Sequence, residues 1–186
     1  MSSAANRGGT HSFDDTILRE YDIRGIVGDT LTADDAYAIG RAFGSEIARN
    51  GGSMVCVGYD GRLSSPEMEG AVVDGLKDCG LEVVRVGLGP TPMLYFAVNV
   101  LNAAGGIMVS GSHNPPEYNG FKMMRGAKPF YGDDILNLGR IAAAATYEAG
   151  TGSDRSEPML DRYVERILQD YRDGRELKVA WDAGNG

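Results

Sequence analysis

Short apolar runs of strand length alternate with helical patterns along this chain, and the alternation limits the folds it can adopt. Residues 54–57 (MVCV) form a continuous apolar run, which suits a strand covered on both faces. The expected strands are residues 54–57, 81–86, 106–110, 121–124 and 177–181. The expected helices are residues 32–50, 65–79, 91–100, 133–145 and 160–171. The predicted fold class is α/β, a layered mixed sheet with helices on both faces.

Local capping signals support these helices. Thr32 and Asp35 are spaced as a capping box, which predicts that a helix begins directly after Thr32. Ser65-Pro66-Glu67 supplies a cap, an N-terminal proline and an acidic first turn for the next helix. Gly80 is a natural residue to end that helix.

Charge and composition exclude several classes of protein. Lys and Arg total 18 and Asp and Glu total 26, a formal net charge of −8, whereas a surface that coats nucleic acid needs excess cations. No run approaches about 18 apolar residues, so no membrane span is expected. Cys56 and Cys79 are too few for a disulfide framework and are expected to be buried, reduced thiols. We therefore expect a cytoplasmic globular protein without nucleic-acid or membrane partners.

One segment is basic within this acidic chain. Residues 105–130 carry three basic residues against one acid, a local net charge of +2. This distribution favours a small anionic ligand over a polyanion. The basic residues are Lys122, Arg125 and Lys128, which are equally consistent with a solvated strand edge.

The same segment contains a polar loop, residues 110–116 (SGSHNPP), directly after a predicted strand. Ligand loops in α/β sheets lie at the carboxyl ends of strands. A serine hydroxyl is a weak nucleophile unless a neighbour takes its proton and cations hold the electrophile, and His113 and the basic residues downstream supply such groups. The loop also suits a tight turn whose side chains bond their own backbone. Residue chemistry alone leaves both interpretations open.

Four ordered motifs resemble those of the α-D-phosphohexomutase family. They are residues 19–25 (REYDIRG), 58–62 (GYDGR), 87–92 (GLGPTP) and 110–115 (SGSHNP), the last followed by 119–122 (NGFK). The first has the form typical of phosphomannomutase/phosphoglucomutase members. The usual family string at the serine loop is TASHNP, so Ser110-Gly111 replaces Thr-Ala, a small-for-small change. The resemblance spans about residues 13–186.

The resemblance implies phosphoryl transfer centred on Ser112. This residue would be the phosphoserine that gives a phosphoryl group to a sugar phosphate and later recovers one. Lys122 and Arg24 would flank that group, stabilise its charge and assist proton movement at the sugar hydroxyl. The implied function is interconversion of hexose 1-phosphate and hexose 6-phosphate, of mannose or glucose, through hexose 1,6-bisphosphate. The implied cofactor is Mg²⁺, bound to Ser112 through its phosphate.

Other residues would support this chemistry by the same resemblance. His113 and Asn114 would position the phosphoserine, and Tyr21 would line the cleft and, with Asn114, contact the substrate. Arg62 lies in an Asp-Gly-Arg turn, which fits a purely structural role as well as a contact with the site.

The resemblance covers only the first of the family's four domains. The predicted organisation is a disordered arm (1–12), a serine-loop domain (13–172) with a linker-like stretch at 146–157, and the start of a second domain (177–186). The other Mg²⁺ ligands and the sugar-recognition loop would lie beyond Gly186, so we expect this chain alone to be inactive. The strand at 177–181 would lack its sheet, and we expect it to be disordered or to self-associate.

Two other functions remain open. A non-catalytic domain that binds a partner or ligand would leave Ser112 unphosphorylated. A phosphatase or kinase that uses Ser112 as a transient nucleophile is disfavoured, because neither a neighbouring carboxylate site nor a nucleotide loop is evident in the sequence. No G-x-S-x-G motif surrounds Ser112, which argues against an esterase.

Overall fold

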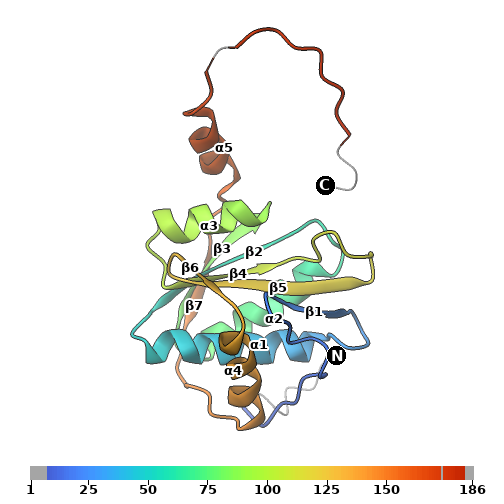
Figure 1. The fold of residues 1–186 in the computed structure, drawn as a ribbon. Coiled ribbons are helices and arrows are strands. Elements are labelled where there is room, and N and C mark those ends of the chain that lie inside the picture. Colours follow the sequence, from blue (N-terminus) through green and yellow to red (C-terminus); the bar gives the residue numbers. More distant parts are fainter. Residues whose placement is uncertain (1–7, 173, 183–186) are drawn as a thin grey trace.

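Strands and helices alternate along the chain in a computed structural model that describes residues 8–172 and 174–182. They form one layered mixed sheet with helices on both faces, which confirms the predicted fold class (Figure 1). The strands are β1 (Ile23–Ile26), β2 (Met54–Tyr59), β3 (Glu82–Leu88), β4 (Gly105–Val109), β5 (Tyr118–Arg125), β6 (Lys128–Phe130) and β7 (Ser153–Ser156). The helices are α1 (Ala33–Arg49), α2 (Ser65–Lys77), α3 (Thr91–Val100), α4 (Asp133–Ala143) and α5 (Leu160–Leu168).

The sheet has a parallel half and an antiparallel half. Its strand order is β1-β5-β4-β2-β3-β7, with β6 paired to β5 off this path. Strands β4, β2, β3 and β7 run parallel, whereas β5 is antiparallel to β4, β1 and β6. Tyr59 and Val109, at the carboxyl ends of β2 and β4, are register partners. The loops that follow them are therefore neighbours, where ligands bind in α/β sheets.

One of the two predicted N-terminal caps is formed. The Thr32 hydroxyl accepts from the Asp35 N–H at 3.2 Å and Asp35 Oδ2 accepts from the Thr32 N–H at 2.7 Å, so the capping box is formed. Ser65 is not the cap of α2 but its first residue: the N-cap position is Ser64, which makes no side-chain capping bond, and the Ser65 hydroxyl donates to Asp60 Oδ1 at 2.6 Å instead. Helix α3 begins at Thr91 and ends at Val100, as predicted. Gly80 has φ of +83°, in the left-handed region open to glycine, and directs the chain from α2 into β3.

Two apolar cores lie on opposite faces of the sheet. The first is formed with α1, α2 and α4, and the second with α3. Val55 and Val57 contribute to the first core and Cys56 to the second, so successive residues of β2 are buried on both faces. This accounts for the continuous apolar run in the sequence.

The segment expected to be a linker, residues 146–157, contains strand β7. Its residues are all exposed and polar, so apolar periodicity carried no signal. Backbone pairing with β3 is reinforced by Lys77 Nζ, 2.8 Å from Asp154 Oδ1, and by Arg155 Nε, 2.8 Å from Glu82 Oε1. Ion pairs and backbone bonds hold this edge strand in place of apolar burial. Strands β1 and β6 were also not predicted.

The arm expected to be disordered, residues 1–12, falls partly on residues 1–7, outside the described residues. The structure differs from that expectation at His11. Its Nε2 is 2.7 Å from Asp35 Oδ1, its N–H donates to the Ala142 carbonyl, and its ring packs edge-on against Phe13. These partners are distant in sequence, so local composition could not reveal them.

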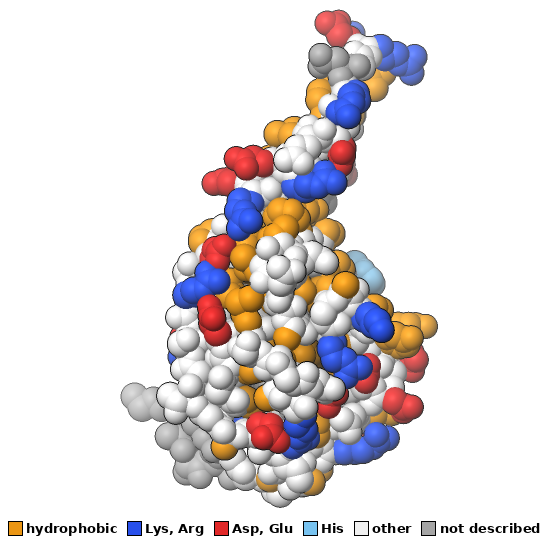
Figure 2. Space-filling model, turned by 90° about the vertical axis from the view of Figure 1, so that its left-hand side faces the viewer, with side chains coloured by type: hydrophobic (Ala, Val, Ile, Leu, Met, Phe, Trp, Pro, Cys, Tyr) orange, Lys and Arg blue, Asp and Glu red, His pale blue; other side chains and the backbone are white. Residues whose placement is uncertain are grey.

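Helix α5 and the residues after it project from the layered body (Figures 1 and 2). The helix has no buried residue and ends before the predicted position 171. It touches α3, where the rings of Tyr163 and Phe96 have centroids 5.8 Å apart. Residues 177–181, assigned to a sheet of the second domain, form no strand here, and no strand among residues 8–172 and 174–182 offers them backbone partners. Their self-association stays a prediction.

No helix within the described ranges is long and apolar enough to cross a bilayer.

Candidate active site

The serine loop lies at the edge where β2 and β4 end. Residues 110–117 connect β4 to β5, and the Ser110 N–H donates to the Gly120 carbonyl at 2.9 Å, which closes the base of the loop. Gly120 is also the register partner of Arg24 on β1. The first residue of the loop is therefore bonded to β5 at the position where β5 pairs with Arg24.

Ser112 combines a strained backbone with an exposed side chain. Its φ is +51°, in a region that costs a non-glycine residue about 1–3 kcal/mol. Its N–H donates to the Ser110 hydroxyl at 3.0 Å, and its Oγ is 3.2 Å from His113 Nδ1. The hydroxyl thus has a histidine partner and is open to an incoming electrophile.

The rest of the loop is ordered by bonds to its own backbone and by Arg62. The Asn114 side chain donates to the Gly111 carbonyl at 2.9 Å, so it shapes the loop; its contact with substrate stays a prediction. Arg62, in the turn after β2, donates to carbonyls of the loop, including that of Ser112 at 3.1 Å. The Arg62 side chain packs directly against Gly111, where a built Cβ would lie 1.9 Å from Arg62 Nε.

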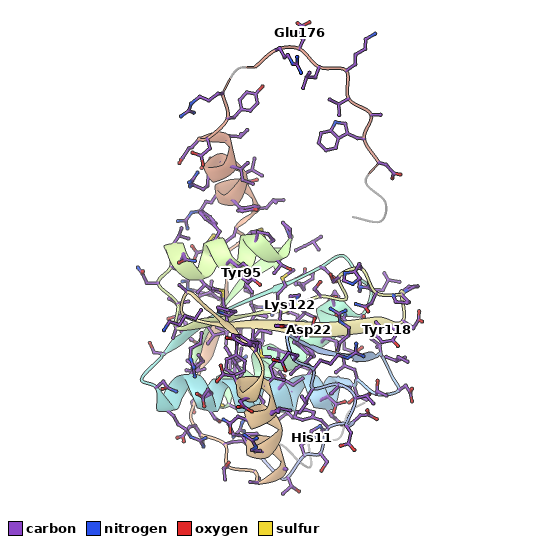
Figure 3. The ribbon with its side chains drawn as sticks, viewed as in Figure 1. His11, Asp22, Tyr95, Tyr118, Lys122 and Glu176 are labelled. Atoms are coloured by element: carbon purple, nitrogen blue, oxygen red, sulfur yellow. The ribbon has the colours of Figure 1, made fainter. Side chains whose placement is uncertain are left out.

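Asp22, Arg24 and Lys122 form a charged cluster beside the loop, and Figure 3 shows Asp22 and Lys122 close together. Ile23 and Phe121 are register partners that face the core with α1, so their neighbours Asp22, Arg24 and Lys122 share the opposite face. Asp22 Oδ2 lies 2.5 Å from Arg24 Nη2 and 3.5 Å from Lys122 Nζ. One carboxylate therefore joins the two cations that the resemblance assigns to phosphoryl stabilisation.

The cluster retains capacity for an anion. Two cations share one carboxylate, which leaves a formal excess of one positive charge. The side chains of Asp22 and Arg24 are each only 12% exposed, and Arg24 Nε is buried without a hydrogen-bond partner within the described residues. A buried donor without an acceptor is costly, and an anionic oxygen would satisfy it.

The structure brings the predicted residues together as two groups. Ser112, His113 and Asn114 lie in the loop, and Arg24 and Lys122 meet at Asp22. Within residues 8–172 and 174–182, no hydrogen bond or ion pair joins Ser112 to either cation.

Arg125, which contributes to the basic character of the segment, does not join these groups. It pairs with Glu46 at 2.7 Å and with Asp134 at 3.7 Å, residues of α1 and α4 on the other face.

Tyr21 lies at an aromatic cavity that Lys122 also lines. The Tyr21 ring stacks on that of Tyr131, with centroids 6.3 Å apart, and remains 72% exposed. The cavity has a volume of about 530 Å³ and is completed by Tyr95, Met123, Pro129 and Phe130. Aromatic walls with a single cation are typical of a small-molecule site.

Sequence reasoning missed Asp22 and left Arg62 undecided. Asp22 and Arg24 are two apart, which puts them on one face of an extended segment, and this alternation was the available signal. The position of Lys122 opposite Asp22 follows from the pairing of β1 with β5, which no local pattern reveals.

The described residues contain no group of three or more His, Cys, Asp or Glu placed to hold a metal ion. Near the serine, Asp60 uses Oδ2 to accept from the Gly111 N–H at 2.9 Å and Oδ1 to accept from the Ser65 hydroxyl at 2.6 Å. Mg²⁺ prefers six oxygen ligands, and these residues do not supply such a set.

Comparisons with known proteins give a consistent result. The family model described as "Phosphoglucomutase/phosphomannomutase, alpha/beta/alpha domain I" matches residues 15–147. A Pseudomonas aeruginosa protein named phosphomannomutase/phosphoglucomutase is 47% identical over 171 residues, which cover 92% of this chain and 37% of the relative. A Neisseria gonorrhoeae protein named phosphoglucomutase is 44% identical over 172 residues, 91% of this chain and 37% of the relative.

A solved structure agrees with these relatives. The crystal structure of a phosphoglucomutase/phosphomannomutase family protein from Burkholderia thailandensis matches with a TM-score of 0.83 and 46% identity, over 88% of this chain and 37% of that one. The chain thus spans about 37% of the length of the curated relatives it matches.

Proposed function

Because this chain belongs to the phosphoglucomutase/phosphomannomutase family, we propose that it is the serine-loop domain of an enzyme that interconverts hexose 1-phosphate and hexose 6-phosphate. Mannose and glucose phosphates are the proposed substrates, and Ser112 is the proposed phosphoserine. The observation that carries this proposal is the exposed Ser112 hydroxyl, 3.2 Å from His113 Nδ1, on a loop whose base is bonded to the strand that pairs with Arg24.

The proposed step transfers the phosphoryl group from Ser112 to a hydroxyl of the bound hexose phosphate. The bond between phosphorus and Ser112 Oγ breaks as a bond forms to the sugar oxygen. The sugar hydroxyl loses its proton, and Ser112 Oγ takes one as the serine hydroxyl returns. The hexose 1,6-bisphosphate then donates its other phosphoryl group to Ser112, which restores the phosphoserine and releases the isomeric hexose phosphate.

The charged cluster suits this chemistry. A phosphoserine carries about −1.5 to −2 charges near neutral pH, and phosphoryl transfer depends on cations placed around that charge. Lys122 and Arg24 would supply them, while Asp22 holds the two in a fixed arrangement. In the unphosphorylated protein the Asp22 carboxylate limits their mutual repulsion.

The proposed Mg²⁺ would take one oxygen from phosphorylated Ser112. When bound, it would neutralise negative charge on the transferring group. The described residues do not complete its coordination, so we further propose that these 186 residues alone catalyse no turnover.

The test is transfer of labelled phosphate from hexose 1,6-bisphosphate to the full-length protein that carries this chain. Ser112→Ala should remove the label, whereas Ser156→Ala, on the exposed strand β7, should leave it unchanged. Arg24→Ala and Lys122→Ala should each slow labelling by about 10²–10³-fold, the usual effect of removing one transition-state charge contact. Label that persists in Ser112→Ala would contradict the assignment.

A further inference from the structure

The Arg62 side chain is inserted into the serine loop and binds its backbone. Nη1 donates to the carbonyl of Pro115 at 2.7 Å and to that of Tyr118 at 2.9 Å. Nη2 donates to the carbonyl of Asn114 at 2.6 Å and to that of Ser112 at 3.1 Å. Three of these carbonyls belong to the loop and the fourth to Tyr118, the first residue of β5, which is labelled in Figure 3. One guanidinium therefore binds carbonyls along the whole connection between β4 and β5.

Arg62 uses most of its donors on the loop. A guanidinium has five N–H donors, two on each Nη and one on Nε. The four Nη donors bind loop carbonyls, and Nε lies 3.6 Å from Asp60 Oδ2 as an ion pair. The side chain therefore acts on the reaction through the loop, which makes it a positioning residue.

Asp60 ties the same loop to the end of β2. Its Oδ2 accepts from the Gly111 N–H at 2.9 Å, and its Oδ1 accepts from the Arg62 N–H at 3.1 Å. The turn after β2 thus holds the serine loop by a carboxylate at one point and a guanidinium at four others. Asp60 accepts a hydrogen bond from the backbone of this connection, and Arg62 donates hydrogen bonds to it.

Gly111 provides the space that Arg62 occupies. A Cβ at this position would lie 1.9 Å from Arg62 Nε and 2.2 Å from Cζ, closer than any real side chain approaches. The guanidinium of Arg62 thus packs directly against the Gly111 backbone.

We propose that Arg62 holds the Ser112 backbone at its φ of +51° and so presents Ser112 Oγ for phosphoryl transfer. This inference rests on the proposed role of Ser112 as the phosphoserine. A non-glycine residue leaves the left-handed region unless its surroundings impose it, and the bond from Arg62 to the Ser112 carbonyl is one such constraint. Without Arg62, the fraction of loops that are competent for transfer falls, and the rate falls with it.

The test is Arg62→Ala in the full-length protein. This change should lower kcat by about 10–100-fold, as expected for a displaced reacting group, with KM changed by less than about threefold because Arg62 binds the loop and not the substrate. A kcat equal to that of the wild type would overturn the proposal.

Chemical rescue separates positioning from general folding damage. Guanidinium ion at low millimolar concentration should partly restore Arg62→Ala, because it can occupy the vacated position. Arg162→Ala, an exposed arginine on α5, is the matched control and should keep full activity.

Backbone amide hydrogen exchange keeps the inference testable if the proposed function fails. Arg62→Ala should speed exchange at residues 111–118 by at least about tenfold while β2, β4 and α1 stay protected. If wild-type Ser112 accepts no phosphate but the loop loosens as expected, the proposed function is wrong and the positioning role stands. Unchanged exchange in the loop would overturn the positioning role whatever the activity.

Discussion

The Asp22→Asn substitution tests the cation cluster most sharply. Asp22 Oδ2 lies 2.5 Å from Arg24 Nη2 and 3.5 Å from Lys122 Nζ, and the Asp22 and Arg24 side chains are each 12% exposed. The amide is nearly isosteric and can still accept a bond from Arg24, so the change removes charge with little change of shape. Both cations then lack their counter-ion.

The magnitude follows from these distances. At an effective dielectric constant of about 20, unit charges about 3.5 Å apart attract by about 5 kcal/mol, and desolvation of the carboxylate offsets part of that gain. Removing one partner of a buried pair costs about 3–5 kcal/mol. Because Lys122 is 34% exposed and the amide keeps one bond, we expect a loss of about 2–3 kcal/mol in the free energy of unfolding.

The assay is urea unfolding followed by far-ultraviolet circular dichroism. The single tryptophan, Trp181, is 91% exposed in the projecting segment, so its fluorescence would not report on the sheet. Inorganic phosphate at about 100 times its Kd should restore about 2.7 kcal/mol to Asp22→Asn, and less to the wild type, because the variant's cations are unneutralised.

The matched control is Glu148→Gln, which removes the carboxylate 2.9 Å from Arg49 Nε in a pair that is more than a third exposed. It should cost about 0.2–1 kcal/mol and gain no more from phosphate than the wild type does. Equal losses and equal phosphate responses in the two variants would refute the reasoning.

Three further predictions concern other parts of the molecule. Burial raises the pKa of Asp35, but hydrogen bonds that include one from His11 outweigh burial and leave the pKa below its usual value. The ionised Asp35 therefore stabilises the folded protein above the unfolded pKa of about 3.9, and this contribution is lost as pH falls through the lower folded pKa. Asp35→Asn should therefore flatten the acid limb of stability in urea titrations from pH 6 to 2, and an unaltered limb would count against it. In Gly75→Ala the new Cβ would lie 2.3 Å from the Tyr37 carbonyl, so thermal unfolding should show a loss of about 1–3 kcal/mol rather than a gain in helix propensity. Burial raises the pKa of Cys56 to about 12, so iodoacetamide at pH 8 should label it only after unfolding, and rapid labelling of the native chain would disprove this.

Local signals predicted much of the fold. The helix after Thr32 carries its capping box in sequence, the helix at Thr91 is marked by Pro92 in its first turn, and the strand at residues 54–57 carries its burial pattern. Strand β7 was missed because it is exposed, polar and held by backbone bonds to a distant strand. The segment at 177–181 was expected to lack its sheet, and it forms no strand, because a strand needs a neighbouring strand for its backbone hydrogen bonds.

The site was predicted residue by residue but not as an arrangement. Motifs identified Ser112, Arg24 and Lys122, whereas their grouping depends on which strands pair. The antiparallel register of β1 and β5 places Asp22 between the two cations. The Asp-Gly-Arg turn left Arg62 open to both interpretations until the side chain was seen to bind the loop carbonyls.

The most direct test of this account is intact mass and peptide mapping of the full-length protein purified from its own cells. The account predicts a phosphate on Ser112 that leaves when hexose monophosphate is added without bisphosphate. An unmodified Ser112 that hexose 1,6-bisphosphate cannot phosphorylate would contradict the phosphoserine mechanism and favour a non-catalytic binding domain.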